Sequence, residues 1–159
     1  MNPIRIKEYL DQAQKYADKE SGCCKVAVGA LLLPSRHKVT LLGANITLPK
    51  SCRVAGCRRV DLYGEDSKNH RLPSDCRSLH SEIAVISEAA KYGMSTDRAT
   101  LFVTRYPCEA CARTIVNAGI STVYYGREQV ISEETAEIFK SHNVEVKHIS
   151  SWTYEDTER

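Results

Sequence analysis

The sequence His80-Ser81-Glu82, followed by Pro107-Cys108-Glu109-Ala110-Cys111, decides how the rest of the chain is interpreted. One imidazole and two thiolates are donors that a tetrahedral Zn²⁺ ion prefers, and three protein ligands leave its fourth position open, as a catalytic site requires. A glutamate two residues after the histidine can serve water in that position as a base. We therefore predict that His80, Cys108 and Cys111 bind a catalytic zinc and that Glu82 is the catalytic residue.

Each half of this pattern is predicted to open a helix. Cys108 and Cys111 are three residues apart, so they share one face in the first turn of a helix over 108–118. His80 opens another helix over 80–92, so two helix N-termini can converge on the ligands of one cation. The positive end of a helix also lowers the pKa of a thiol. Two other interpretations stay open: buried cysteines with a core histidine, or a redox Cys-x-x-Cys, which needs neither the histidine nor the glutamate.

The composition is that of an ordinary globular protein. Of 159 residues, 42% are hydrophobic, 26% charged and 7% aromatic, with a net charge of +2. This length predicts a single domain over 1–159 with a sizeable core. The modest charge and few aromatic residues argue against a nucleic-acid partner. No signal peptide or membrane span is expected, and the odd number of cysteines, seven, indicates metal or thiol chemistry in the cytoplasm before disulfides.

Apolar spacing predicts an α/β fold in which strands alternate with helices after an opening hairpin. Residues 46–79 show no clear periodicity, and irregular stretches of this length are usually functional or disordered. They carry seven basic and four acidic residues, a net +3, so the positive charge is concentrated there. Helices are expected at 3–19, 80–92, 108–118 and 133–141, and strands at 26–33, 39–44, 100–104, 122–125 and 144–149.

The pattern H-x-E…P-C-x-x-C is a signature of zinc-dependent deaminases. On these residues the chain resembles the cytidine and deoxycytidylate deaminase superfamily, and within it the dCMP deaminases of the phage and competence-operon type. The resemblance implies a three-layer α-β-α sandwich with a five-stranded mixed sheet, and a homo-oligomer, often a hexamer. It also includes Val28-Gly29-Ala30, Gly43-Ala44-Asn45, Cys52-x4-Cys57 and Cys76-Arg77.

The resemblance implies hydrolytic deamination of a free cytosine nucleotide, with dCMP and water giving dUMP and ammonia. Alternative substrates are a nucleoside, guanine, or a base in single-stranded nucleic acid or tRNA. A catalytically silent zinc-binding assembly subunit is a further alternative, against which Glu82 argues. The substrate-binding candidates are Asn45, Ser81, Tyr106 and Arg77.

Each of these candidates has its own reason. Asn45 matches an asparagine that contacts the substrate sugar in relatives, although the tyrosine and glycine that flank it there are missing, which puts activation by dCTP in doubt. Ser81 replaces a usual alanine, and its hydroxyl can alter base contacts. Tyr106 can stack on a base, or it can be a partly buried aromatic residue.

Six of the seven basic residues of 46–79 are candidates for a 5′-phosphate contact, because guanidinium groups bind phosphate through two parallel hydrogen bonds. Any one of them, taken alone, is more often a solvated surface charge. The group consists of Arg53, Arg58, Arg59, Lys68, Arg71 and Arg77.

Four further cysteines form a candidate second metal set. The spacing Cys-x4-Cys lies within the range found in zinc sites, and members of the resembling group carry a structural zinc. Such an ion would hold the 46–79 stretch and contribute directly to folding. Free, partly buried thiols are the alternative, and His70 or Cys24 could replace one ligand. The set is Cys23, Cys52, Cys57 and Cys76.

Overall fold

The computed structural model describes residues 1–36, 39–47, 51–64, 76–128 and 132–154. A five-stranded mixed sheet, in the order β2-β1-β5-β6-β7, forms its centre. β1 pairs antiparallel with β2 and β5, whereas β6 pairs parallel with β5 and β7. The predicted mixed sheet and its opening hairpin are therefore confirmed. The strands are Gly29–Leu33 (β1), Leu41–Ala44 (β2), Thr100–Arg105 (β5), Thr122–Arg127 (β6) and Glu145–His148 (β7).

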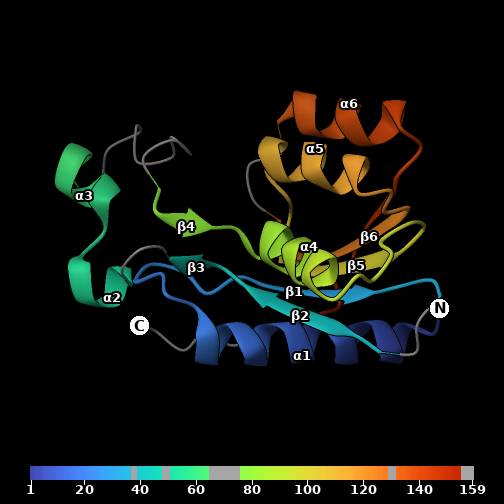
Figure 1. Ribbon diagram of the computed structural model, residues 1–159, viewed down its shortest axis with the longest axis horizontal. Helices are drawn as coiled ribbons and strands as arrows, with labels where there is room; N and C mark the ends of the chain where they lie inside the picture. Colours follow the sequence, from blue (N-terminus) through green and yellow to red (C-terminus); the bar gives the residue numbers. More distant parts are fainter. Residues whose placement is uncertain (37–38, 48–50, 65–75, 129–131, 155–159) are drawn as a thin grey trace.

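Helices cover both faces of this sheet (Figure 1). The N-terminal helix α1, Pro3–Glu20, lies along one face and packs Leu10 against Phe102 and Tyr124. The other face is covered by α4 (Ser81–Lys91), α5 (Glu109–Asn117) and α6 (Glu133–Ser141). The three-layer α-β-α prediction is confirmed. In the described part of the chain, no helix combines the length and the apolar character that crossing a bilayer demands.

Two of the four long helices begin with a capping side chain, and two do not. Oδ1 of Asn2 accepts a hydrogen bond from the amide of Ile4 at the start of α1, and Ser132 caps α6 in the same way. The cap positions of α4 and α5 are His80 and Cys108, whose side chains make no capping hydrogen bond. The residue at the cap position of a helix usually has an oxygen-bearing side chain that bonds the free amides. His80 and Cys108 do not cap, so the starts of α4 and α5 have another role.

The stretch 46–79, expected to be irregular, contains short regular elements. Two helices of four and six residues, α2 and α3, lie beyond one end of the sheet (Figure 1). Two strands of two residues each, β3 and β4, pair antiparallel. Elements this short complete too few turns or alternations to leave a periodic pattern, which is why the sequence did not reveal them. Their bounds are Ile46–Thr47 (β3), Cys52–Ala55 (α2), Arg58–Tyr63 (α3) and Ser78–Leu79 (β4).

The first predicted strand, 26–33, begins three residues late, at Gly29. A Cβ at Gly29 would stand 1.9 Å from the carbonyl oxygen of Ala13, so glycine permits α1 to approach the strand closely. Residues 26–28 are instead held by a side chain, because Asn45 bonds the carbonyl of Val26 and the amide of Val28. Because residues 26–28 do not pair in the sheet, Val26 and Val28 can border a cleft.

Replacing Gly43 of β2 should disturb the start of α4. A Cβ at Gly43 would lie 2.6 Å from the carbonyl oxygen of Ser81 and 2.8 Å from the amide nitrogen of Val85. We expect Gly43→Ala to lower the free energy of unfolding by about 1–3 kcal/mol, as overpacking does. Urea unfolding measures the loss.

A matched control lies at the far end of the same helix. Gly93 has a φ of +62°, and a Cβ there would meet no atom within 4 Å. Gly93→Ala should therefore cost a similar amount, about 1–2 kcal/mol, through backbone strain alone. Only Gly43→Ala should also lower the zinc content, since it displaces the residues beside His80. Equal zinc content in the two variants would contradict this account.

Candidate metal centre

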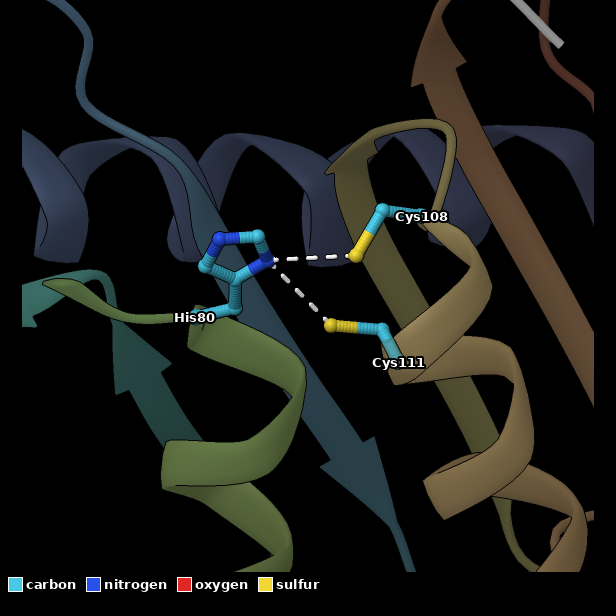
Figure 2. A group of neighbouring side chains, drawn as sticks. All are labelled: His80, Cys108 and Cys111. Carbon is cyan, nitrogen blue, oxygen red and sulfur yellow. Dashed lines mark hydrogen bonds between the residues drawn. The ribbon is translucent and has the colours of Figure 1, made fainter. Parts of the chain in front are cut away.

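Three side chains from two helix starts meet at one point. His80 directly precedes α4, Cys108 directly precedes α5, and Cys111 lies in the first turn of α5. Figure 2 shows the imidazole and the two sulfurs pointing toward one another from these neighbouring helices. Nδ1 of His80 is 3.4 Å from each sulfur. Among the described residues this is the one group of three or more candidate ligands whose donor atoms all lie within 4.8 Å of one another.

The spacing and the donor types fit zinc. A tetrahedral ion with Zn–N of about 2.0 Å and Zn–S of about 2.3 Å separates the nitrogen from each sulfur by about 3.5 Å. The distances of 3.4 Å in this structure are within about 0.1 Å of that value. One imidazole nitrogen and two sulfurs are also a soft and borderline donor set that suits zinc. A fourth ligand position stays available for water or substrate.

The three donor groups of this centre differ in their affinity for protons, and a bound cation would change that affinity. Hydrogen bonding from Cys111, with help from His80, lowers the pKa of Cys108 to about 4 although the thiol is partly buried. The pKa of Cys111 is raised, because its thiol donates to Cys108 and because it is buried. The contact with Cys108 likewise raises the pKa of His80. The thiolate of Cys108 thus favours the protonated forms of its two neighbours, Cys111 and His80, and a bound dication would displace those protons.

Glu82 lies beside this centre without belonging to the three-donor group. Its side chain is in the first turn of α4 and only 4% exposed. Burial raises the pKa of its carboxyl, an effect that the nearby His80 opposes. Oγ of the fully buried Ser81 donates to Oε2 of Glu82 over 3.1 Å. A carboxyl whose pKa is raised toward neutrality is suited to both accept and return a proton.

A cleft of about 620 Å³ opens onto the centre. Small-molecule sites commonly have volumes of about 300–1,000 Å³. β5 and β6 run parallel, and β2 points the same way because β1 is antiparallel to both β2 and β5. The carboxyl ends of these strands therefore share one edge of the sheet, where open α/β sheets place their ligands. The cleft is bordered there by Asn45 after β2, Arg105 and Tyr106 at the end of β5, and Glu128 after β6.

The structure brings three of the four predicted substrate contacts to this cleft: Asn45, Ser81 and Tyr106. Asn45 uses one amide donor and one lone pair on the backbone of residues 26–28, so one of each remains for a ligand. The hydroxyl of Ser81 is turned to Glu82. Tyr106 is 5% exposed and packs edge-on against Tyr125, at 4.9 Å between ring centroids.

Arg77, the fourth predicted contact, is not among the cleft residues. Its Nη1 donates to the carbonyl oxygen of Gly56 over 3.4 Å, between α2 and α3. Two other arginines border the cleft, Arg59 and Arg105, of which the sequence had suggested Arg59 as one of six. Of the basic candidates, Lys68 and Arg71 lie outside the described residues.

Two charged cleft residues were missed by sequence reasoning. Arg105 stands directly before the Tyr106-Pro107-Cys108 sequence, so its place beside the metal motif was a usable signal. Glu128 had none, because only the pairing of β6 with β5 brings it to the cleft. Its carboxylate lies 3.3 Å from Nδ1 of His148 in β7.

The additional cysteines also gather in one region. The pKa of Cys52 is raised by burial and by the charges of four other cysteines, so Cys52 lies near each of them: Cys23, Cys24, Cys57 and Cys76. The sulfurs of Cys23 and Cys76 each accept a hydrogen bond of 3.4 Å from the backbone amide two residues later. In the described part of the chain, no three of these sulfurs lie within 4.8 Å of one another, unlike the donors of the first centre. His70 lies outside the described residues.

Hydrogen bonds explain how Cys52 comes near Cys23. Oγ of Ser51, the cap of α2, donates to the carbonyl of Gly22, and Oγ1 of Thr47 accepts from the amide of Cys52. A Cβ at Gly22 would lie 2.3 Å from Oγ1 of Thr47, so glycine permits this approach. The short helix α2 is thus tied to the segment that follows α1.

Comparison with known proteins identifies relatives over most of the chain. Residues 4–127 match the family model of the cytidine and deoxycytidylate deaminase zinc-binding region. ComE operon protein 2 of Bacillus subtilis (strain 168) is 31% identical over 152 residues, covering 94% of this chain and 74% of that protein. The deoxycytidylate deaminase of enterobacteria phage T4 is 28% identical over 145 residues, covering 84% of this chain and 72% of that protein.

A solved structure shares the fold along its whole length. The crystal structure of dCMP deaminase from the cyanophage S-TIM5 in complex with dCMP and dUMP aligns with a TM-score of 0.69 and 25% identity. The alignment covers 94% of this chain and 99% of that one.

Zinc binding should release protons and weaken on acidification. Cys111, with its raised pKa, must lose a proton at pH 7, and His80 loses a further fraction, whereas Cys108 is already ionised. We expect about one to two protons to be released at this centre, because metal ligands bind deprotonated. Calorimetry in buffers of different ionisation enthalpy counts them, with Cys111→Ser as the variant in which the release should fall by about one. Unchanged release in that variant would contradict the assignment.

Proposed function

This chain belongs to the cytidine and deoxycytidylate deaminase family, and from that premise we propose that it hydrolytically deaminates a free cytosine nucleotide. The substrate we propose is dCMP, which with water gives dUMP and ammonia. Support for the choice comes from the phage T4 relative and from the cyanophage enzyme, whose structure holds dCMP and dUMP. The whole of residues 1–159 acts in this proposal as one catalytic domain with 46–79 as an insertion.

One observation carries the proposal: a buried carboxyl and a three-donor metal centre border the same cleft. His80, Cys108 and Cys111 would hold the catalytic zinc, and Glu82 lies beside them without being a fourth donor. A closed structural site would have no use for a buried carboxyl whose desolvation is unfavourable. A reaction that moves protons at the metal centre needs such a group.

Glu82 carries the proton transfers in this mechanism. Zinc, when bound, supplies Lewis acidity that makes water nucleophilic near neutral pH. Glu82 accepts a proton from the water that attacks C4 of the cytosine ring and passes it to N3. It then takes the remaining proton of the new C4 hydroxyl group and gives it to the amine, which leaves as ammonia while the C4 carbonyl forms. The hydroxyl of Ser81 donates to Oε2 of Glu82, which fixes the direction of the carboxylate.

The cleft residues orient the nucleotide in this proposal. Asn45 holds the 26–28 segment and presents its remaining amide donor and lone pair to the sugar. Tyr106 forms a rigid wall, because its ring is fixed between Tyr125 and Phe139. We assign Arg77 a supporting part, since its guanidinium bonds Gly56 between α2 and α3.

We further propose a structural zinc in the cysteine cluster of Cys23, Cys52, Cys57 and Cys76. Two of these sulfurs accept backbone N–H bonds, which favour a thiolate. Burial, and after it repulsion from the neighbouring thiolates, raises the pKa of Cys52, and a dication would relieve that repulsion. Cys24 can replace one ligand, since its pKa is also raised by burial and by Cys23 and Cys57. The expected homo-oligomer and the cytoplasmic location stay predictions from the resemblance and the composition.

The substrate is tested by measuring ammonia release from a panel. The panel contains dCMP, CMP, deoxycytidine, dCTP, guanine and a short single strand. We expect dCMP to give the highest kcat/KM. A preference for the uncharged nucleoside, for guanine or for the single strand would replace the proposed substrate, and no release from any compound would favour a non-catalytic zinc-binding subunit.

Replacing Glu82 with glutamine should remove catalysis while the metal stays. The amide cannot accept the water proton, so we expect kcat to fall by about 10²–10⁴-fold, the usual contribution of a general base. Glu109→Gln is the matched control, because Glu109 also stands in the first turn of a helix at this centre but is partly exposed. Turnover of Glu82→Gln equal to that of Glu109→Gln would remove Glu82 from the mechanism.

Metal content tests the second zinc. We expect two equivalents per chain, one of which is lost in Cys52→Ser and the other in His80→Ala. Cys52→Ser should also lower the Tm, because a structural ion contributes to folding free energy, whereas activity per remaining zinc should change less. One equivalent in the unmodified protein would refute the second site.

A further inference from the structure

We propose that Arg59 of α3 binds the 5′-phosphate of the substrate and so distinguishes a nucleotide from a nucleoside. The inference rests on the proposed function and goes further, because it names the residue that recognises the anionic end of the substrate. Arg59 belongs to the insertion and not to the zinc motifs. The insertion thereby gains a part in substrate choice.

The first support is an unpaired donor in the cleft wall. Arg59 borders the cleft together with His80, Ser81 and Glu82. Its Nε is buried, and no atom in the described part of the chain forms a hydrogen bond with it. A buried N–H without a partner is destabilising by about 1–3 kcal/mol, so such groups commonly mark a place where a ligand supplies the acceptor. A phosphate oxygen is a strong acceptor for a guanidinium N–H.

The second support is the charge around Arg59. Of the two carboxylates in the cleft wall, Glu82 lies at the metal centre and Glu128 is 3.3 Å from His148. Arg105 adds a second guanidinium from the end of β5. An anion that enters past the metal centre would therefore meet positive charge from two elements.

The third support is the way in which α3 is held. Gly56, with a φ of +75°, turns the chain between α2 and α3, and Nη1 of Arg77 donates to its carbonyl. Gly64 closes the far end of α3, where its amide bonds the carbonyl of Val60. Two neighbouring arginines of α3 differ in position: Arg58 is exposed and does not border the cleft, whereas Arg59 does. This arrangement gives a matched pair for the test.

Binding of product and product nucleoside tests the assignment without turnover. Calorimetric titration of the zinc-loaded wild type, Arg59→Ala and Arg58→Ala with dUMP and deoxyuridine gives two affinities for each protein. We expect Arg59→Ala to weaken dUMP about 10- to 100-fold, the loss of a charged hydrogen bond, and to leave deoxyuridine within about twofold. Arg58→Ala should change neither.

Arg59→Lys keeps the charge but loses the planar fork, so its dUMP affinity should fall between those of wild type and Arg59→Ala. Thermal melting of each variant identifies any that fail to fold, in which case Arg59→Lys decides. Three results would overturn the inference: Arg59→Ala retaining the wild-type preference for dUMP, Arg59→Ala weakening both ligands equally, as a structural or metal-tuning role predicts, or a wild type that binds both ligands equally. The proposed function fails separately, if the wild type releases no ammonia from cytosine compounds.

Discussion

The convergence of two helix starts on three donor atoms is the constraint on which the rest of this structure depends. α4 and α5 begin with a histidine and a cysteine where a capping oxygen would normally stand. Helix N-termini carry partial positive charge, which is unfavourable for a cation but favourable for anions. Two sulfurs that ionise, together with the carboxyl of Glu82, provide the negative charge that makes a dication acceptable at this position.

The sheet determines where those helix starts can meet. The parallel pairing of β5 with β6 and the direction of β2 place three strand ends at one edge, and the residues after them form the cleft wall. Glycines at two positions make the packing possible: Gly29 admits α1 against β1, and Gly43 admits the start of α4 against β2. The site therefore depends on close backbone contact on both faces of the sheet.

The short helices α2 and α3 lie beyond one end of this sheet (Figure 1). This unit is tied to the segment after α1 by Ser51 and Thr47, and its cysteines lie near those of neighbouring segments. In our proposals a metal ion holds this unit in place, and Arg59 extends from it to the substrate. Catalysis and substrate choice would then reside in different parts of the chain, which would let one change without the other.

Residue spacing was enough to predict the donor group of the centre and most of the layers. The spacing of His80, Glu82, Cys108 and Cys111 is local along two helix starts, so residue identity was enough to predict the donor group that the structure assembles. Long helices and strands also left clear periodic patterns. By contrast, it is the packing of the folded chain that brings Arg59 and Glu128 to the cleft and places Arg77 against Gly56. These positions depend on strand pairing and on elements of two to six residues, and contacts between distant segments leave no periodic trace in the chain.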